Sequence, residues 1–326
     1  MFLNTRTKSK QLIQYEALAR RSTLTREQGR RLKFLQSGYQ GEAAYDRLFD
    51  EAGHGNLLIY RDLWLKIENA TLQIDALVIT DDLLTVNEIK NYSGIYSCDN
   101  EGWYINGRQI SENPLAQVSR TAGKLMRMQY LQSVPFKVEK KAVFVNPNLH
   151  LTINSKDNAL NIVERSLLRP YFKDLKSMNA GPQASELSNL IEAFIIEDPM
   201  ELPEHKPEHI KSGNCCYQCG SFKLEHGKFI AVCKQCGYHE TNERIVLRSI
   251  IDFTALFPNS RLNKNNIHHF VGKIQHERSI TKLLNKYCIQ LGNGKSTYYR
   301  LSSLDFETIL KDGGYKSRYE KEIVMG

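Results

Sequence analysis

Two closely similar cysteine pairs constrain the fold of this chain more than any other feature. Cys216 and Cys219 form one C-x2-C pair, Cys233 and Cys236 form the other, and thirteen residues separate the pairs. Each pair is followed by glycine (CYQCG and CKQCG), which permits the left-handed turn that brings two thiolates onto one ion. The stretch between the pairs predicts a hairpin. We therefore predict a zinc ribbon over residues 212–242, in which the four cysteines hold one structural zinc ion.

The role of this ribbon is open between two interpretations. The module can be purely structural, because zinc supplies much of the folding free energy of so small a unit, or its hairpin can bind nucleic acid. It is similar to topoisomerase-type zinc ribbons. Cys98, Cys215 and Cys288 lie outside the pairs. Cys215 adjoins Cys216 and is interpreted as a spare thiol, although the two could exchange as ligands.

The sequence predicts neither a membrane protein nor a secreted one. No segment has the roughly 18 or more consecutive apolar residues of a membrane helix. The opening stretch MFLNTRTKSKQLIQ is basic and polar, without the apolar core and cleavage site of a secretory signal. Paired cysteines in such a chain favour a metal over disulfides. A cytoplasmic location is expected.

Charge divides the chain into three blocks. Residues 1–40 hold nine basic and two acidic groups and are interpreted as a basic helical arm, broken near residues 22–25. Residues 41–210 hold 17 basic and 24 acidic groups, whereas residues 211–326 hold 18 basic and 10 acidic groups. Basic flanks suit a polyanion such as nucleic acid. The acidic middle suits a divalent-cation site, although a solvated acidic surface would have the same composition.

The middle block alternates between helical and extended patterns. A helix is predicted from Gly41, and a second begins at Asn113–Pro114. The expected strands are 56–65, 72–80, 83–90, a meander through residue 107, and 141–147. This order, α-β-β-β-α-β, predicts a mixed sheet flanked by helices.

Two carboxylates and a lysine are expected to converge in this block. Asp75 lies within an apolar strand, and Glu88 and Lys90 share one face of the next strand. A two-residue turn at Asp81–Asp82 would bring Asp75 close to Glu88. Converging carboxylates repel unless a cation joins them, and Mg²⁺ or Mn²⁺ suits such oxygen ligands. With a lysine beside them, this is the chemistry of metal-assisted phosphodiester hydrolysis.

Four short motifs in order resemble a known family. They are Gly41–Glu42 at a helix, Q-I-D at 73–75, E-I-K at 88–90 and N-P-L-x-Q at 113–117. Together they are similar to the nuclease-related domain (NERD) family of the PD-(D/E)xK restriction-endonuclease-like superfamily. The resemblance implies a NERD nuclease-like domain over residues 41–165 with an α/β (α+β) fold, in which a restriction-endonuclease-like mixed sheet is flanked by helices. The first position of the motif here is Ile74 instead of proline.

The resemblance also implies a role for each matched residue. Asp75, Glu88 and the carbonyl of Ile89 would bind the catalytic Mg²⁺ or Mn²⁺, and Lys90 would activate water or stabilise charge. Glu42 would be an accessory ligand or base, and Gln117 would orient the site or the phosphate.

Each of these residues also has a structural interpretation. Asp75 and Lys90 could form a cross-strand ion pair, and Glu42 could be an ordinary acid in the first turn of a helix. Gln117 could be a solvated helix residue. Sheet packing is the favoured interpretation, over base stacking, of four aromatic residues: Tyr92, Tyr96, Trp103 and Tyr104.

The C-terminal part follows a helix and a proline-containing linker at residues 166–211. Residues 243–326 predict three helices and a hairpin, in the order of a winged-helix-like domain. Basic residues spaced four apart on the third helix, followed by two on the wing, suit nucleic-acid contacts. They are Arg278, Lys282, Lys286, Lys295 and Arg300. The alternative is a solvated face on a packing or protein-interaction module.

The favoured function is a metal-dependent nuclease that hydrolyses phosphodiester bonds in nucleic acid, with DNA as the expected substrate. The zinc-ribbon and winged-helix modules would hold that substrate. The first alternative is a non-catalytic nucleic-acid-binding or regulatory protein on a nuclease-like scaffold, and the second is a zinc-stabilised interaction adaptor.

Overall fold

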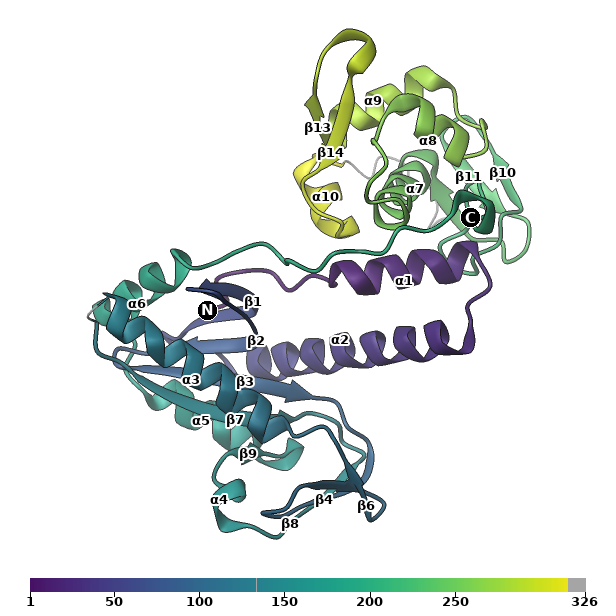
Figure 1. The fold of residues 1–326 in the computed structure, drawn as a ribbon. Helices are drawn as coiled ribbons and strands as arrows, with labels where there is room; N and C mark the ends of the chain where they lie inside the picture. Colours follow the sequence, from purple (N-terminus) through teal and green to yellow (C-terminus); the bar gives the residue numbers. More distant parts are fainter. Residues whose placement is uncertain (133, 316–326) are drawn as a thin grey trace. The chain divides into compact units, whose positions relative to one another are not determined.

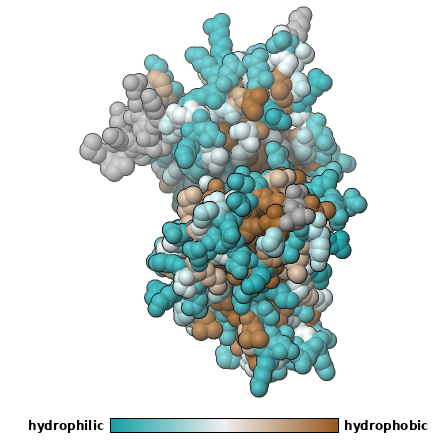
Figure 2. Space-filling model, turned by 90° about the vertical axis from the view of Figure 1, so that its left-hand side faces the viewer, coloured by the Kyte–Doolittle hydropathy of each residue, from teal (hydrophilic) through white to brown (hydrophobic). Residues whose placement is uncertain are grey.

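The computed structural model describes residues 1–132 and 134–315, and the chain divides into two compact units. Unit 1 comprises residues 1–7 and 34–199, and unit 2 comprises residues 8–33 and the chain from residue 200 onward. Residues 1–40, interpreted above as one basic arm, are therefore shared between the units. Within the described residues, no helix is both long and apolar enough to cross a lipid bilayer. Figure 2 shows hydrophilic side chains over most of the visible face, with apolar residues in scattered patches.

Unit 1 is built on a five-stranded mixed sheet, which confirms the predicted fold class (Figure 1). The strand order is β1-β2-β3-β7-β9. Strands β1 to β3 pair antiparallel, whereas β3–β7 and β7–β9 pair parallel. The strands are β1 (Leu58–Ile67), β2 (Ala70–Ile79), β3 (Leu83–Lys90), β7 (Lys137–Phe144) and β9 (Ile162–Val163).

Helices cover both faces of this sheet. One face packs against α2 (Arg26–Ala52) and α5 (Leu168–Ser177), and the ring of Phe49 stacks on that of Phe172 with centroids 4.3 Å apart. The other face packs against α3 (Pro114–Gln132), which Figure 1 shows crossing the sheet, and α6 (Pro182–Glu192). The sheet is thus the middle of three layers, and its strands are buried on both sides.

Helix α2 begins at Arg26, so the prediction of a helix starting at Gly41 is wrong. Thr25 and Gln28 form a reciprocal capping box: the Gln28 N–H donates to Thr25 Oγ1 at 3.2 Å, and the Thr25 N–H donates to Gln28 Oε1 at 2.9 Å. Gly41 does not start the helix but allows a close contact in its middle. A Cβ at this position would lie 2.5 Å from the Cβ of Asn91, so glycine allows the chain after β3 to touch the helix.

The predicted meander exists, but it belongs to a separate four-stranded sheet in the order β6-β5-β4-β8. Trp103 is 1% exposed and packs on Phe144, while Tyr92 and Tyr96 stack on each other with centroids 4.9 Å apart. These contacts support sheet packing for Tyr92, Tyr96 and Trp103. The strands are β4 (Gly94–Cys98), β5 (Trp103–Ile105), β6 (Arg108–Ile110) and β8 (Leu149–Ile153), and the short helix α4 (Lys156–Ala159) follows.

Unit 2 joins a small antiparallel sheet to a helical core. The sheet order is β10-β11-β12, and a separate hairpin, β13–β14, follows the third helix of the core. The three helices and the hairpin lie where the sequence predicts them. The elements are β10 (Leu224–His226), β11 (Ile230–Cys233), β12 (His239–Thr241), α7 (Asn242–Leu256), α8 (Lys264–Phe270), α9 (Glu277–Tyr287), β13 (Cys288–Leu291), β14 (Tyr298–Leu301) and α10 (Phe306–Asp312).

Helix α1 (Lys10–Arg21) belongs to the core of unit 2 and is not a solvated arm. Its residues Ile13, Ala17 and Leu18 are buried in the same cluster as the apolar residues of α7. Asp252 of α7 is fully buried and accepts hydrogen bonds from Arg20 at 2.6 Å and Arg21 at 2.7 Å. The amphipathic pattern of α1 thus serves packing, and part of its basic charge is neutralised inside the unit.

Replacing Arg21 is expected to destabilise unit 2 strongly. The Arg21 side chain is 0% exposed, so Arg21→Gln leaves a buried carboxylate short of a partner, at a cost of about 3–5 kcal/mol. Urea unfolding followed by circular dichroism measures this loss. Arg20→Gln is the control, because the Arg20 side chain is 25% exposed and its loss should cost less. Equal losses in the two variants would contradict the buried packing of α1.

Candidate functional site

The β2–β3 hairpin sets the central geometry of the site. Its turn has two residues, as predicted, and the Thr80 N–H donates to the Leu83 carbonyl at 3.0 Å. The register pairs Ala76 with Asn87, so Asp75 and Glu88 stand opposite each other one step further along the ladder. The Asp75 Oδ2 atom accepts a hydrogen bond from the Ile89 N–H at 2.7 Å. The hairpin alone therefore brings the two predicted metal-binding carboxylates to one place.

The backbone N–H and C=O groups of Ile89 face β2. In an extended strand the N–H and C=O of one residue point to the same side, and the Ile89 N–H points to Asp75. The backbone groups of the next residue face the other way, since the Lys90 carbonyl accepts from the Val145 N–H at 3.1 Å. The Ile89 carbonyl is thus directed to the same side as the Asp75 carboxylate.

Lys90 joins β3 to helix α3. Its Nζ atom lies 2.9 Å from Glu88 Oε1 and donates to Gln117 Oε1 at 3.2 Å. Gln117 lies in the first turn of α3, where Asn113 Oδ1 caps the helix by accepting from the Ala116 N–H at 2.9 Å. The N-P-L-x-Q motif therefore caps the helix with its first residue and reaches Lys90 with its last.

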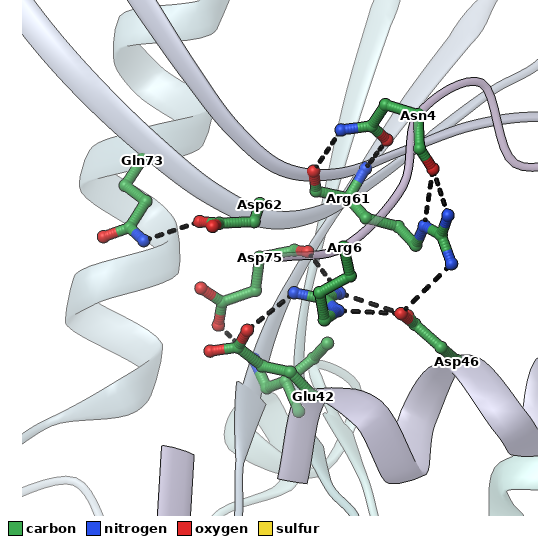
Figure 3. A network of polar contacts seen from close by, with 9 residues as sticks. Asn4, Arg6, Glu42, Asp46, Arg61, Asp62, Gln73 and Asp75 are labelled. Carbon is green, nitrogen blue, oxygen red and sulfur yellow. Dashed lines mark hydrogen bonds and ion pairs between the residues drawn. The ribbon is translucent and has the colours of Figure 1, made fainter. Parts of the chain in front are cut away.

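Glu42 extends from the middle of α2, so the interpretation as a first-turn acid does not hold. Its Oε2 atom accepts from Arg6 Nη1 at 2.6 Å (Figure 3). Arg6 also binds Asp46, with Nε to Oδ2 at 2.7 Å and Nη2 to Oδ1 at 3.1 Å, and it donates to the Asp75 carbonyl at 3.0 Å. The sequence reasoning missed Arg6, because no local pattern links it to residues 36 or more positions away.

Asp62 is a second residue that the sequence reasoning missed. It lies on β1 between the pairs Arg61–Ala76 and Leu63–Ile74, opposite Asp75, with a left-handed φ of +45°. Such a backbone is unusual for a non-glycine residue and often marks a functional site. An acid within the apolar stretch LIYRDLWL is the feature that could have identified it.

The carboxylates of the site are held where their charged forms are disfavoured. Burial, with the charges of Glu88 and Glu42, raises the pKa of Asp75 well above its usual value. Burial raises the pKa of Glu42 to about 7 against the lowering effect of Arg6, and it raises the pKa of Glu88 against Lys90. Acids that repel each other in this way fit a cation.

The donor set suits Mg²⁺ or Mn²⁺ better than a softer ion. Asp75, Glu88 and the Ile89 carbonyl offer hard oxygen atoms, and magnesium in proteins commonly takes one or two carboxylates and keeps several waters. The carboxylates do not form a closed cage. Within the described part of the chain, the only group of three or more ligating side chains close enough to hold an ion is that of the cysteines.

The four paired cysteines form a compact cluster in unit 2 that could hold a metal ion. All four sulfur atoms lie within 4.8 Å of one another. In both knuckles a glycine N–H donates back to the first cysteine carbonyl, at 3.0 Å from Gly220 and 2.8 Å from Gly237. These glycines have φ of +69° and +73°, which is the left-handed turn expected from the sequence. Cys215 is buried outside the cluster.

The basic residues predicted on helix α9 are exposed as expected, opposite the buried Ile280 and Leu284. Arg278, Lys282, Lys286 and, on β14, Arg300 are exposed, but Lys286 is paired with Glu243 at 2.7 Å. The side chain of Lys295, in the turn of the hairpin, lies outside what the structure describes.

A cleft of about 420 Å³ separates this helix from the cysteine-bearing sheet. Lys282 and Lys286 line one side, and Lys228 and Phe229 of the β10–β11 turn line the other.

Comparison with known proteins identifies the region that contains the carboxylates and Lys90. A family model described as nuclease-related domain (NERD) matches residues 37–146. This range contains all four motifs and confirms the resemblance, so residues 37–146 are a nuclease-related domain. It leaves out Arg6 and the four paired cysteines. No curated protein and no solved structure matches the chain.

The cysteine cluster predicts one tightly bound metal ion per chain. Elemental analysis of the purified protein should find about one equivalent, since four clustered thiols form a closed tetrahedral site. Cys233→Ser should lose that ion. Cys215→Ser is the matched control and should keep it, because Cys215 stands outside the cluster. Loss of the ion in both variants would show that the ligand set is assigned wrongly.

Proposed function

We propose, on the premise that residues 37–146 are a nuclease-related domain, that this protein is a metal-dependent nuclease acting on DNA. One observation carries the proposal. Asp75, Glu88 and Lys90 converge at the open end of the β2–β3 hairpin, and Gln117 reaches Lys90 from another layer of the fold. A hairpin and a helix from the next part of the chain thus contribute to one acidic site beside a lysine.

The residues have distinct tasks in this proposal. Asp75, Glu88 and the Ile89 carbonyl hold Mg²⁺ or Mn²⁺, which supplies Lewis-acid stabilisation of a phosphoryl oxygen. Lys90 Nζ, already bound to Glu88 and Gln117, holds a water or a developing negative charge beside the site. Gln117 keeps the ammonium oriented. Glu42 adds a carboxylate, raised in pKa to about 7 by burial, that can accept a proton near neutral pH.

One observation favours the non-catalytic alternative. The carboxylates already have internal cations, since Lys90 pairs with Glu88 at 2.9 Å and Arg6 pairs with Glu42 at 2.6 Å. A scaffold that binds nucleic acid without cutting it could use the same pairs for stability alone. The two functions differ in whether phosphodiester bonds are broken, which is measured directly.

Unit 2 is proposed as the nucleic-acid-binding part, with zinc as the ion of the cysteine cluster. Zinc is the ion that four thiolates in two C-x2-C knuckles most often bind in structural sites. The basic rim of the cleft, with exposed Lys228, Phe229 and Lys282, supports phosphate contacts and stacking on a base.

Cleavage should depend on the hairpin residues. The parent protein, given linear, circular and single-stranded DNA and RNA with Mg²⁺ or Mn²⁺, is expected to cut at least one substrate. Asp75→Asn and Lys90→Met should each lower kcat/KM by about 10²-fold or more, because each removes several kcal/mol of transition-state stabilisation.

The matched controls are Asp82→Asn and Lys137→Met. Asp82 lies in the turn of the same hairpin, and the Asp82 and Lys137 side chains are 70% and 80% exposed. Both controls should cut like the parent. A parent protein that binds DNA but never cuts it would contradict the nuclease proposal and favour the non-catalytic alternative.

DNA affinity should depend on salt through unit 2. Fluorescence anisotropy across a NaCl series gives the slope of log K against log salt. The Lys228→Gln/Lys282→Gln double variant should reduce the magnitude of that slope by about 1–2, because each lost phosphate contact contributes roughly 0.7–0.9. Lys234→Gln is the control, since Lys234 is already paired with Glu225 at 3.3 Å. An unchanged slope in the double variant would exclude the cleft as the binding surface.

A further inference from the structure

The segment 1–7 is an integral part of unit 1, although it lies outside the family-matched range 37–146. It runs along β1, the edge strand of the sheet. Phe2 forms a parallel bridge with Ile59, and the Leu3 N–H donates to the Ile59 carbonyl at 2.8 Å. The Asn4 side chain then accepts from the Arg61 N–H at 2.8 Å and donates to the Arg61 carbonyl at 2.6 Å. These contacts fix where the next residues lie.

Because segment 1–7 packs along β1 in this way, the Arg6 side chain lies at the candidate site. The side chain is 4% exposed, and its guanidinium contacts three partners on two elements: Glu42 and Asp46 on α2, and the carbonyl of Asp75 on β2. Figure 3 shows the guanidinium between Glu42, Asp46 and the strand. The two acids are four positions apart and therefore share one face of the helix.

The geometry requires the planar fork of arginine. Nε and Nη2 both donate to the Asp46 carboxylate, Nη1 donates to Glu42, and Nη2 also donates to the Asp75 carbonyl. A lysine has one ammonium group and cannot span the same set of acceptors. Because each buried carboxylate needs a cation, the arginine both joins the helix to the strand and offsets the charge of Glu42 beside Asp75.

We propose that Arg6 is a positioning residue, which locks α2 to β2 so that Glu42 is held beside Asp75. This inference deepens the proposed nuclease function and, for its catalytic consequence, rests on it. Arg6 acts through Glu42 and Asp75 and has no direct role in the chemistry. The functional unit then consists of the NERD domain together with segment 1–7.

The contact itself is tested by a thermodynamic cycle that needs no activity. In the full chain, Arg6→Gln should lower the Tm of unit 1 by about 10 °C, because a buried ion pair is broken. Adding Glu42→Gln should recover several degrees, since it removes the carboxylate left unpaired. Arg47→Gln is the matched control. Arg47 lies on α2 next to Asp46 but is exposed, so its loss should lower the Tm little and Glu42→Gln should not compensate for it.

The catalytic consequence is tested by steady-state kinetics at saturating Mn²⁺. Arg6→Gln and Arg6→Lys should both lower kcat at least tenfold and leave KM for DNA within about twofold, because the substrate-binding unit is untouched. Arg47→Gln, which removes an exposed arginine of the same helix, should keep kcat within about twofold of the parent. Full recovery of kcat by Arg6→Lys would overturn the proposal, since charge alone would then suffice.

The possible outcomes separate the two proposals. An active parent whose kcat survives Arg6→Gln overturns the positioning role and leaves the nuclease intact. A parent that neither cuts nucleic acid nor binds Mn²⁺ overturns the nuclease. In that case the thermodynamic cycle still tests the inference. Recovery of the Tm of Arg6→Gln by Glu42→Gln supports Arg6 as the residue that holds Glu42, and absence of recovery refutes it.

Discussion

The structure of unit 1 depends on how it accommodates several acids gathered at one end of a buried hairpin. Like charges held close together in a poorly hydrated place repel, and each raises the pKa of the others. Two internal cations offset that repulsion here. Lys90 comes from the same strand as Glu88, and Arg6 comes from the segment at the sheet edge and binds Glu42. Burial, with the charges of Glu88 and Glu42, keeps the pKa of Asp75 raised although Lys90 lowers it.

The layered fold explains why so few contacts are enough to build the site. The two-residue turn fixes the register of the β2–β3 hairpin, and most of its residues are buried between the helix layers. Helix α2 is fixed at close range, because Gly41 lets the chain at Asn91 touch it. Helix α3 is held against the sheet by its buried Val118, Leu125 and Met128. Each functional side chain therefore extends from a rigid element, and the two cations join those elements at the point where chemistry is proposed.

In unit 2 the main constraint is the small size of the sheet that carries the cysteines. A three-stranded sheet with strands of three or four residues buries little surface, and the cysteine cluster can supply the missing cross-links through one ion. The neighbouring helices use buried ion pairs, such as Arg248 with Glu240 at 2.5 Å, to join sheet and core. Part of the positive charge that marks this block in the sequence is thus internal. The exposed remainder on α9 and on the β10–β11 turn is what a polyanion could meet.

The sequence by itself determined the features that depend on short spacing. Both cysteine knuckles, the two-residue turn between β2 and β3 and the lysine beside Glu88 follow from residues a few positions apart, whose geometry is fixed by the local backbone. Only the tertiary structure decided the rest. The place of Asp62 opposite Asp75 and the separate sheet of the meander depend on packing between distant segments. Arg6 shows this most clearly, because nothing near it in the sequence specifies its partners. Its partners are set by the docking of the seven-residue segment on the edge of the sheet.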